Sequence, residues 1–115
     1  MISYIVLYKV RDLFFRARIE QICHQSEVSV ASADSPEELK RMLSNPQPVL
    51  VVLDLANSRL DLVSIASLCS NVEAQVLGYY SHVDVGTRIS ATEAGIKNIT
   101  PKSGLEKKLS ALIHS

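Results

Sequence analysis

The spacing of apolar residues constrains the fold of this chain more than any other feature. Short β-rich apolar runs alternate with segments in which apolar residues recur at helical spacing. The clearest run, residues 49–53, is continuously apolar and leads directly into Asp54. Such a strand is typical of the centre of a parallel sheet, where helices cover both faces. The pattern therefore predicts an α/β protein built on a buried parallel sheet.

Five strand and helix pairs follow one another along the chain. Strands are expected at residues 4–7, 28–31, 49–53 and 76–79 and around Ile99. Helices are expected from near Asp12, from residue 36, over about 60–68, around 88–94 and from about residue 105. With right-handed crossovers, five such pairs predict a flavodoxin-like, doubly wound (βα)5 fold with a five-stranded parallel sheet in the order 2-1-3-4-5. We expect residues 1–115 to form a single domain, because no linker interrupts them.

Local signals mark several helix ends. Residues 35–38, Ser-Pro-Glu-Glu, combine a capping serine with a proline at the first helical position. Gly95 stands where a C-terminal cap favours glycine. Ser103, three residues before a glutamate, predicts a second capping box for the last helix. Asp12 is expected to cap the first helix.

Two pairs of adjacent aromatic residues offer candidate contact surfaces. Phe14 precedes Phe15, and Tyr79 precedes Tyr80. Because neighbouring side chains point in different directions, we expect one ring of each pair to face the core and the other to face outward or sideways.

The charge balance and the cysteines limit the classes of partner and the cellular locations that we expect for the protein. Twelve Lys and Arg residues offset twelve Asp and Glu residues, which argues against nucleic acid or an anionic membrane as the partner. No apolar run approaches the ~20 residues of a membrane span, and the first residues lack the pattern of a signal peptide. Cys23 and Cys69 are far apart and have no metal-binding spacing, so we expect two buried thiols and a cytoplasmic location.

The chain lacks the common enzyme motifs. Neither a P-loop, nor GxGxxG, nor a GxSxG elbow occurs, and residues 9–13 lack the Ser, Thr and Gly of a flavodoxin-type phosphate loop. We therefore do not expect an independent enzyme. In a doubly wound sheet a site lies at the carboxyl ends of the strands. The candidates there are Tyr8, Lys9, Asp54, Tyr80, Ser81, His82 and Lys102.

Three segments resemble the response-regulator receiver domain of the CheY-like superfamily. Residues 49–55 resemble the third strand of that family, which makes Asp54 the equivalent of the phosphoacceptor aspartate. Residues 93–95, Glu-Ala-Gly, resemble the end of its fourth helix, and Lys102 falls where its lysine follows the fifth strand. The resemblance spans about residues 2–113. It implies the receiver fold and a role in two-component or phosphorelay signalling in bacteria.

The chain departs from the family pattern at the positions that bind magnesium and at the switch positions. The family's acidic pair after the first strand is replaced by Tyr8 and Lys9, which leaves Asp54 as the one obvious carboxylate for magnesium. Asp12 could approach from the first loop, but capping the helix that follows is its expected role. The family's switch positions, a Thr or Ser on the fourth strand and an aromatic on the fifth, are replaced by Tyr80 and Ile99.

Two polar residues follow the fourth strand and are candidate accessory groups. Ser81 stands one residue after the position at which the family has its Thr or Ser hydroxyl, and His82 follows Ser81. A loop position or a helix cap is the alternative role for the histidine.

We hypothesise that Lys9 and Lys102 bracket Asp54 in a salt-bridge network that replaces magnesium. No metal or other cofactor is then expected. The chain would be a stand-alone pseudo-receiver that acts through protein–protein contact. By family analogy, the surface that contacts the partner would be formed by the fourth helix, the fifth strand and the fifth helix. A homodimer would use the same surface. The alternative is an atypical response regulator that is phosphorylated on Asp54 and uses magnesium.

Overall fold

Five parallel strands form one sheet in the computed structural model, which describes residues 2–44, 47–57, 60–81 and 85–114. The strands are β1 (Tyr4–Tyr8), β2 (Ser29–Ala33), β3 (Val49–Asp54), β4 (Gln75–Tyr80) and β5 (Asn98–Pro101). Their order is β2-β1-β3-β4-β5, and every pair is parallel. The predicted fold class and strand order are confirmed.

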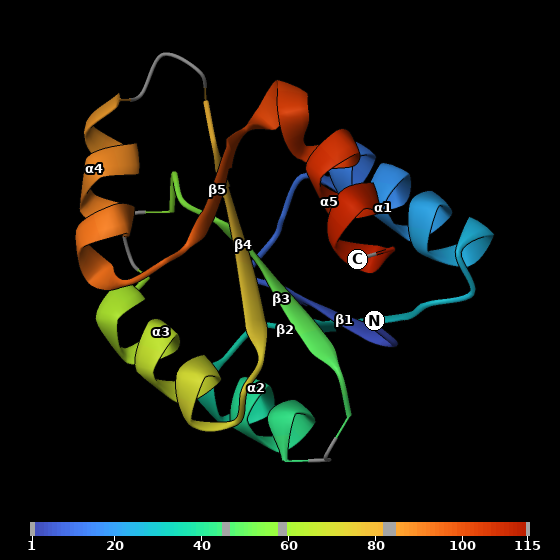
Figure 1. Cartoon of the computed structure of the whole chain (residues 1–115), viewed down its shortest axis with the longest axis horizontal. Helices are drawn as coiled ribbons and strands as arrows, with labels where there is room; N and C mark the ends of the chain where they lie inside the picture. Colours follow the sequence, from blue (N-terminus) through green and yellow to red (C-terminus); the bar gives the residue numbers. More distant parts are fainter. Residues whose placement is uncertain (1, 45–46, 58–59, 82–84, 115) are drawn as a thin grey trace.

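Helices cover both faces of the sheet (Figure 1). They are α1 (Leu13–Gln25), α2 (Pro36–Leu43), α3 (Leu62–Asn71), α4 (Val85–Ala94) and α5 (Leu105–Ile113). Helices α1 and α5 pack on one face, and α2, α3 and α4 pack on the other. None of the helices in the described ranges is long and apolar enough to cross a bilayer.

The core consists of two apolar layers, one on each side of the sheet. Strand β3 contributes to both, because its side chains alternate between the faces. Leu50 and Val52 face α1 and α5, whereas Val51 and Leu53 face the other three helices. All four are fully buried, which explains why this strand has no polar residue before Asp54.

Most helix ends follow the sequence signals. The Ser35 hydroxyl accepts the Glu38 N–H at 3.2 Å, and Gly95 ends α4 with a φ of +101°, a conformation that glycine adopts without strain. Helix α3 begins two residues later than expected, because Asp61 is its N-cap and accepts the Ser64 N–H at 3.1 Å.

The second capping box was a wrong prediction. A 3-10 turn, Lys102–Gly104, precedes α5, and the N-cap is Gly104 rather than Ser103. Gly104 lies so close to Thr100 that a Cβ there would come within 2.7 Å of the threonine hydroxyl. The chain thus turns tightly over β5, and Ser103 is left exposed.

The two pairs of adjacent aromatic residues differ in burial. Phe14 is 87% exposed and Phe15 only 8%, as predicted. Tyr79 and Tyr80 are both buried, so the prediction for that pair was wrong. Since β4 is covered on both faces, Tyr79 packs toward α1 and α5 while Tyr80 packs toward α2, α3 and α4.

Candidate functional site

Asp54 is the last residue of β3, at the edge of the sheet where the carboxyl ends of the strands meet. Its side chain is half-buried, and Oδ1 accepts the backbone N–H of Ala56 at 3.0 Å. Strand alternation places Asp54 on the same face as Leu50 and Val52, toward α1 and α5.

An open cleft of about 500 Å³ lies beside Asp54. It is lined by Asp54, Lys9, Arg11, Ala56 and Asn57. Lys9 is held in a left-handed conformation, with φ of +54°, and its N–H donates to the Ala33 carbonyl at 2.9 Å. One carboxylate and two cations therefore line the cleft. This donor set does not suit Mg²⁺, which prefers carboxylate oxygens and water.

Lys102 is paired with Asp12 and not with Asp54. Its Nζ lies 2.8 Å from Asp12 Oδ2, while Asp12 Oδ1 accepts the Phe15 N–H at 3.1 Å and so caps α1. The Lys102 hydrogen bond, followed by the Phe15 N–H, holds the pKa of Asp12 below its usual value.

The predicted salt-bridge network around Asp54 is thus wrong. Within the described ranges neither Lys9 nor Lys102 forms an ion pair with Asp54. Lys9 lines the same cleft without reaching the carboxylate. Lys102 is diverted because the predicted cap at the start of α1, which is confirmed, presents a free carboxylate oxygen to it.

Tyr79 is the residue of this site that the sequence reasoning missed. It is the β4 residue paired with Asp54, and its ring packs on Phe15 with centroids 4.7 Å apart. In turn, the Lys102 ammonium lies 4.9 Å from the centre of the Phe15 ring. Strand alternation could have revealed it, because the register puts residue 79, and not 80, beside Asp54.

The Tyr79 hydroxyl is buried without a hydrogen-bond partner in the described part of the chain. Burial raises the pKa of this phenol, and the nearby charges of Asp54 and Asp12 raise it further. The Asp54 carboxylate is also near enough to the phenol to raise its pKa as a weak acceptor, although the two do not meet the geometry of an ordinary hydrogen bond.

The remaining predicted site residues do not gather around Asp54. Tyr8, Tyr80 and Ile99 pack into the layer on the opposite face of the sheet. Ser81 is exposed just after β4. His82 lies outside the described residues.

No built metal centre is found in residues 2–44, 47–57, 60–81 and 85–114, since no three His, Cys, Asp or Glu side chains lie together there. Cys23 and Cys69 are buried and unpaired. Burial raises the pKa of each thiol to about 11, so both are poor nucleophiles and poor metal ligands at neutral pH.

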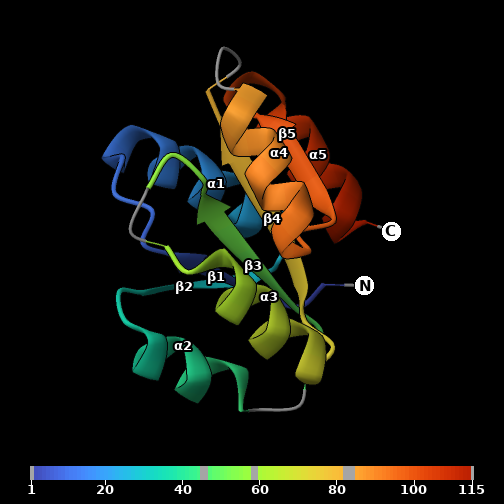
Figure 2. The ribbon, with the colours of Figure 1, turned by 90° about the vertical axis from the view of Figure 1, so that its left-hand side faces the viewer.

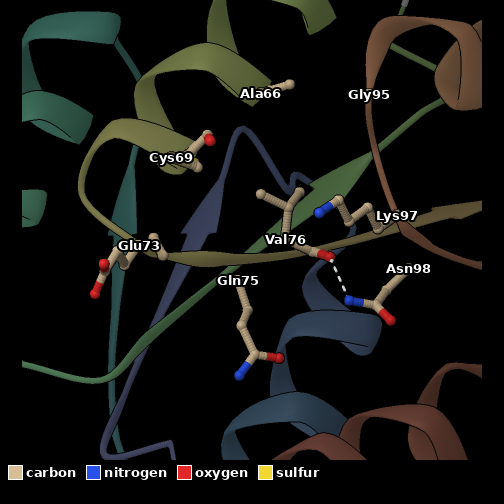
Figure 3. A pocket seen from close by; sticks show the side chains of 10 residues that line it. Ala66, Cys69, Glu73, Gln75, Val76, Gly95, Lys97 and Asn98 are labelled. Atoms are coloured by element: carbon tan, nitrogen blue, oxygen red, sulfur yellow. Dashed lines mark hydrogen bonds between the residues drawn. The ribbon is translucent and has the colours of Figure 1, made fainter.

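A second hollow, of about 400 Å³, lies at the opposite edge of the sheet (Figure 3). Its polar lining residues are Ser70, Glu73, Gln75, Lys97 and Asn98. The Asn98 amide is already used, because it donates to the Val76 carbonyl at 3.2 Å. We therefore place the candidate site at the Asp54 edge.

Comparison with solved structures identifies the fold. A response regulator from Thermotoga maritima superposes with a TM-score of 0.76 over 100% of both chains, at 16% identity. A response regulator signal receiver domain from Bermanella marisrubri gives 0.73 over 98% of this chain and 99% of that one, at 18% identity. A Burkholderia pseudomallei response regulator with a phosphorylated aspartic acid and a calcium ion gives 0.71 over 96% and 66%, at 19% identity.

These likenesses show that the fold is that of receiver domains. No protein-family model matches the sequence, and no curated protein sequence does.

The two roles of Asp12 predict a pH effect. The pKa of Asp12 is lowered in the folded state, so this group stabilises the fold above its unfolded pKa, and that stability is lost as the pH falls through the folded value. Asn keeps the cap but carries no charge. We expect Asp12→Asn to lose less stability than the wild type between about pH 5 and pH 2 in urea titrations. If the two proteins lose the same stability over this pH range, the result would contradict the pairing of Asp12 with Lys102.

The unpartnered phenol predicts an unusual response to Tyr79→Phe. Removing a buried hydroxyl that makes no hydrogen bond should raise the free energy of unfolding by about 1 kcal/mol. The control Tyr79→Leu also removes the ring packed on Phe15, and it should lower that free energy by about 1–3 kcal/mol. Denaturant unfolding of the three proteins measures both effects. A clear loss of stability in Tyr79→Phe would show that the hydroxyl has a partner.

Proposed function

We propose that this chain is a pseudo-receiver, a receiver-like signalling domain whose metal-dependent phosphorylation site is degenerate. The observation that carries the proposal is the lining of the Asp54 cleft. Lys9 and Arg11 stand there with a single carboxylate, and the other nearby carboxylate, Asp12, is engaged by Lys102 and by the cap of α1. A divalent cation would have to enter a cleft that is already lined by two positively charged side chains.

The switch positions support the same proposal. Tyr80 is buried, and Ile99 packs into the layer beneath α2, α3 and α4. A buried tyrosine ring is too constrained to swing as a small hydroxyl side chain would, and isoleucine offers no aromatic ring to move with it. A signal therefore has to reach the surface by another route than the family's hydroxyl and aromatic pair.

The proposed output is contact with another signalling protein. Val85 and Ile89 on α4 are 63% and 54% exposed, which supports a partner surface formed by α4, β5 and α5. A second copy of the chain is the other occupant proposed for this surface. The unpaired thiols of Cys23 and Cys69 are consistent with the cytoplasm as the proposed location.

One observation favours the alternative of an atypical phosphoacceptor. Asp54 is half-buried in an open cleft, and no ion pair with a described residue blocks its carboxylate. The Burkholderia protein of the same fold carries a phosphorylated aspartic acid. In this chain the lysine and arginine would have to stabilise the charge that develops on the phosphoryl group.

A phosphodonor assay separates the two functions. The protein and an Asp54→Asn control are incubated with acetyl phosphate, with and without Mg²⁺, and their intact masses are measured. The pseudo-receiver function predicts no phosphoryl adduct under either condition. A Mg²⁺-dependent adduct on the wild type that is absent from Asp54→Asn would establish the phosphoacceptor instead.

A charge reversal tests the reason given for the degenerate site. Lys9→Asp places a second carboxylate in the Asp54 cleft, and aspartate tolerates the left-handed backbone of this position. We expect Mg²⁺ affinity, measured by titration calorimetry, to rise from undetectable to measurable. Lys40→Asp, outside this cleft, is the matched control and should bind no better than the wild type. If Lys9→Asp gains no affinity, the cations are not what excludes the metal.

A further inference from the structure

A groove of about 350 Å³ lies between α2 and α3, above the end of β1. Figure 2 shows the two helices side by side on the same face of the sheet. Its walls are apolar, with Leu39 from α2 and Ile65 and Leu68 from α3. This volume lies within the usual range for small-molecule sites. The groove is separate from the Asp54 cleft, but Lys9 lines both.

The polar groups at the groove are mainly hydrogen-bond donors. Lys9 and Lys40 line it, and neither forms an ion pair with any residue that the structure describes. Tyr8 adds a phenol whose pKa is raised by burial and then by the charge of Glu37, a carboxylate that acts on the groove from outside its lining.

The one carboxylate in the lining, Asp61, is already engaged. It accepts the Ser64 N–H at 3.1 Å and the Ser64 hydroxyl at 2.8 Å. The groove thus sets two ammonium groups against the single negative charge of Asp61, above an apolar floor, and its lining carries a net positive charge. Charge complementarity calls for an occupant with an anionic head and an apolar body.

We propose that the groove binds a small amphipathic carboxylate, whose apolar chain lies between Leu39 and Leu68 and whose carboxylate accepts hydrogen bonds from Lys9 and Lys40. The apolar walls of the groove belong to α2 and α3 rather than to loops, so little of the binding energy is spent on ordering them.

The position of Lys9 gives this site a consequence for Asp54. Its backbone is fixed by the Ala33 hydrogen bond and by the left-handed conformation, so the side chain has a defined origin between the groove and the cleft. The Lys9 ammonium lies 5.6 Å from the centre of the Tyr8 ring, which lines the groove. An anion in the groove holds the ammonium on this side and lowers the positive charge of the Asp54 cleft. This step rests on the proposed function, since it supplies the input that would replace phosphorylation.

The test is a titration of ¹⁵N-labelled protein with octanoate, followed by NMR, with octanol and octylamine as neutral and cationic probes of equal chain length. We expect saturable shifts of the Leu39, Ile65 and Lys9 amides with octanoate. Octanol should bind more weakly, and octylamine weakest. Equal binding of octylamine, or shifts confined to other surfaces, would overturn the proposal.

Two pairs of variants test whether Lys9 and Lys40 bind the carboxylate of octanoate. Lys40→Gln should weaken octanoate about three- to fivefold, whereas Arg41→Gln, on the same helix but outside the lining, should not. Lys9→Gln should weaken it similarly, whereas Arg11→Gln, which lines only the Asp54 cleft, should not. The spectra themselves show that each variant is folded. Unchanged affinity in both lysine variants would overturn the assignment.

The same spectra test the connection to Asp54. The Ala56 amide, which donates to the Asp54 carboxylate, should shift with octanoate in the wild type and much less in Lys9→Gln. If the Ala56 amide does not shift with octanoate, the connection between the groove and Asp54 is wrong, whereas the groove site itself is unaffected. If the phosphodonor assay yields an adduct while octanoate still binds, the pseudo-receiver function fails and the groove does not.

Discussion

The burial of β3 on both faces is the constraint on which the rest of the structure depends. Its apolar side chains join the two layers of the core, and β1 and β4 pair with its two edges. A strand so enclosed can carry a charged residue only where it leaves the core. Asp54 occupies that point, so the candidate site is a consequence of how the sheet is buried.

The sequence predicted the fold nearly completely, because the fold depends on patterns that repeat along the chain. The alternation of strand and helix, the capping box at Ser35 and the glycine at residue 95 all act locally. Errors arose where a tertiary contact decided the outcome. Gly104 against Thr100 changed the start of α5, and the double cover of β4 buried both tyrosines.

The site was predicted less well than the fold, because ion pairs depend on where side chains meet in space. The sequence placed Asp54, Lys9 and Lys102 at one edge of the sheet but could not choose among partners for Lys102. The sequence favours a capping role for Asp12 over an approach to the magnesium position, and the carboxylate caps α1 with one oxygen while binding Lys102 with the other. A carboxylate with two oxygens serves two partners, a possibility that residue spacing does not reveal.

The burial of both cysteines has a practical consequence for work on this protein. Each thiol has a pKa of about 11, so only a small fraction is thiolate at neutral pH, and the core shields it from reagents. A cysteine introduced at an exposed position such as Phe14 would react with a maleimide dye far faster than either native thiol. Fluorescent or spin labels can therefore be placed on this chain while Cys23 and Cys69 remain in place.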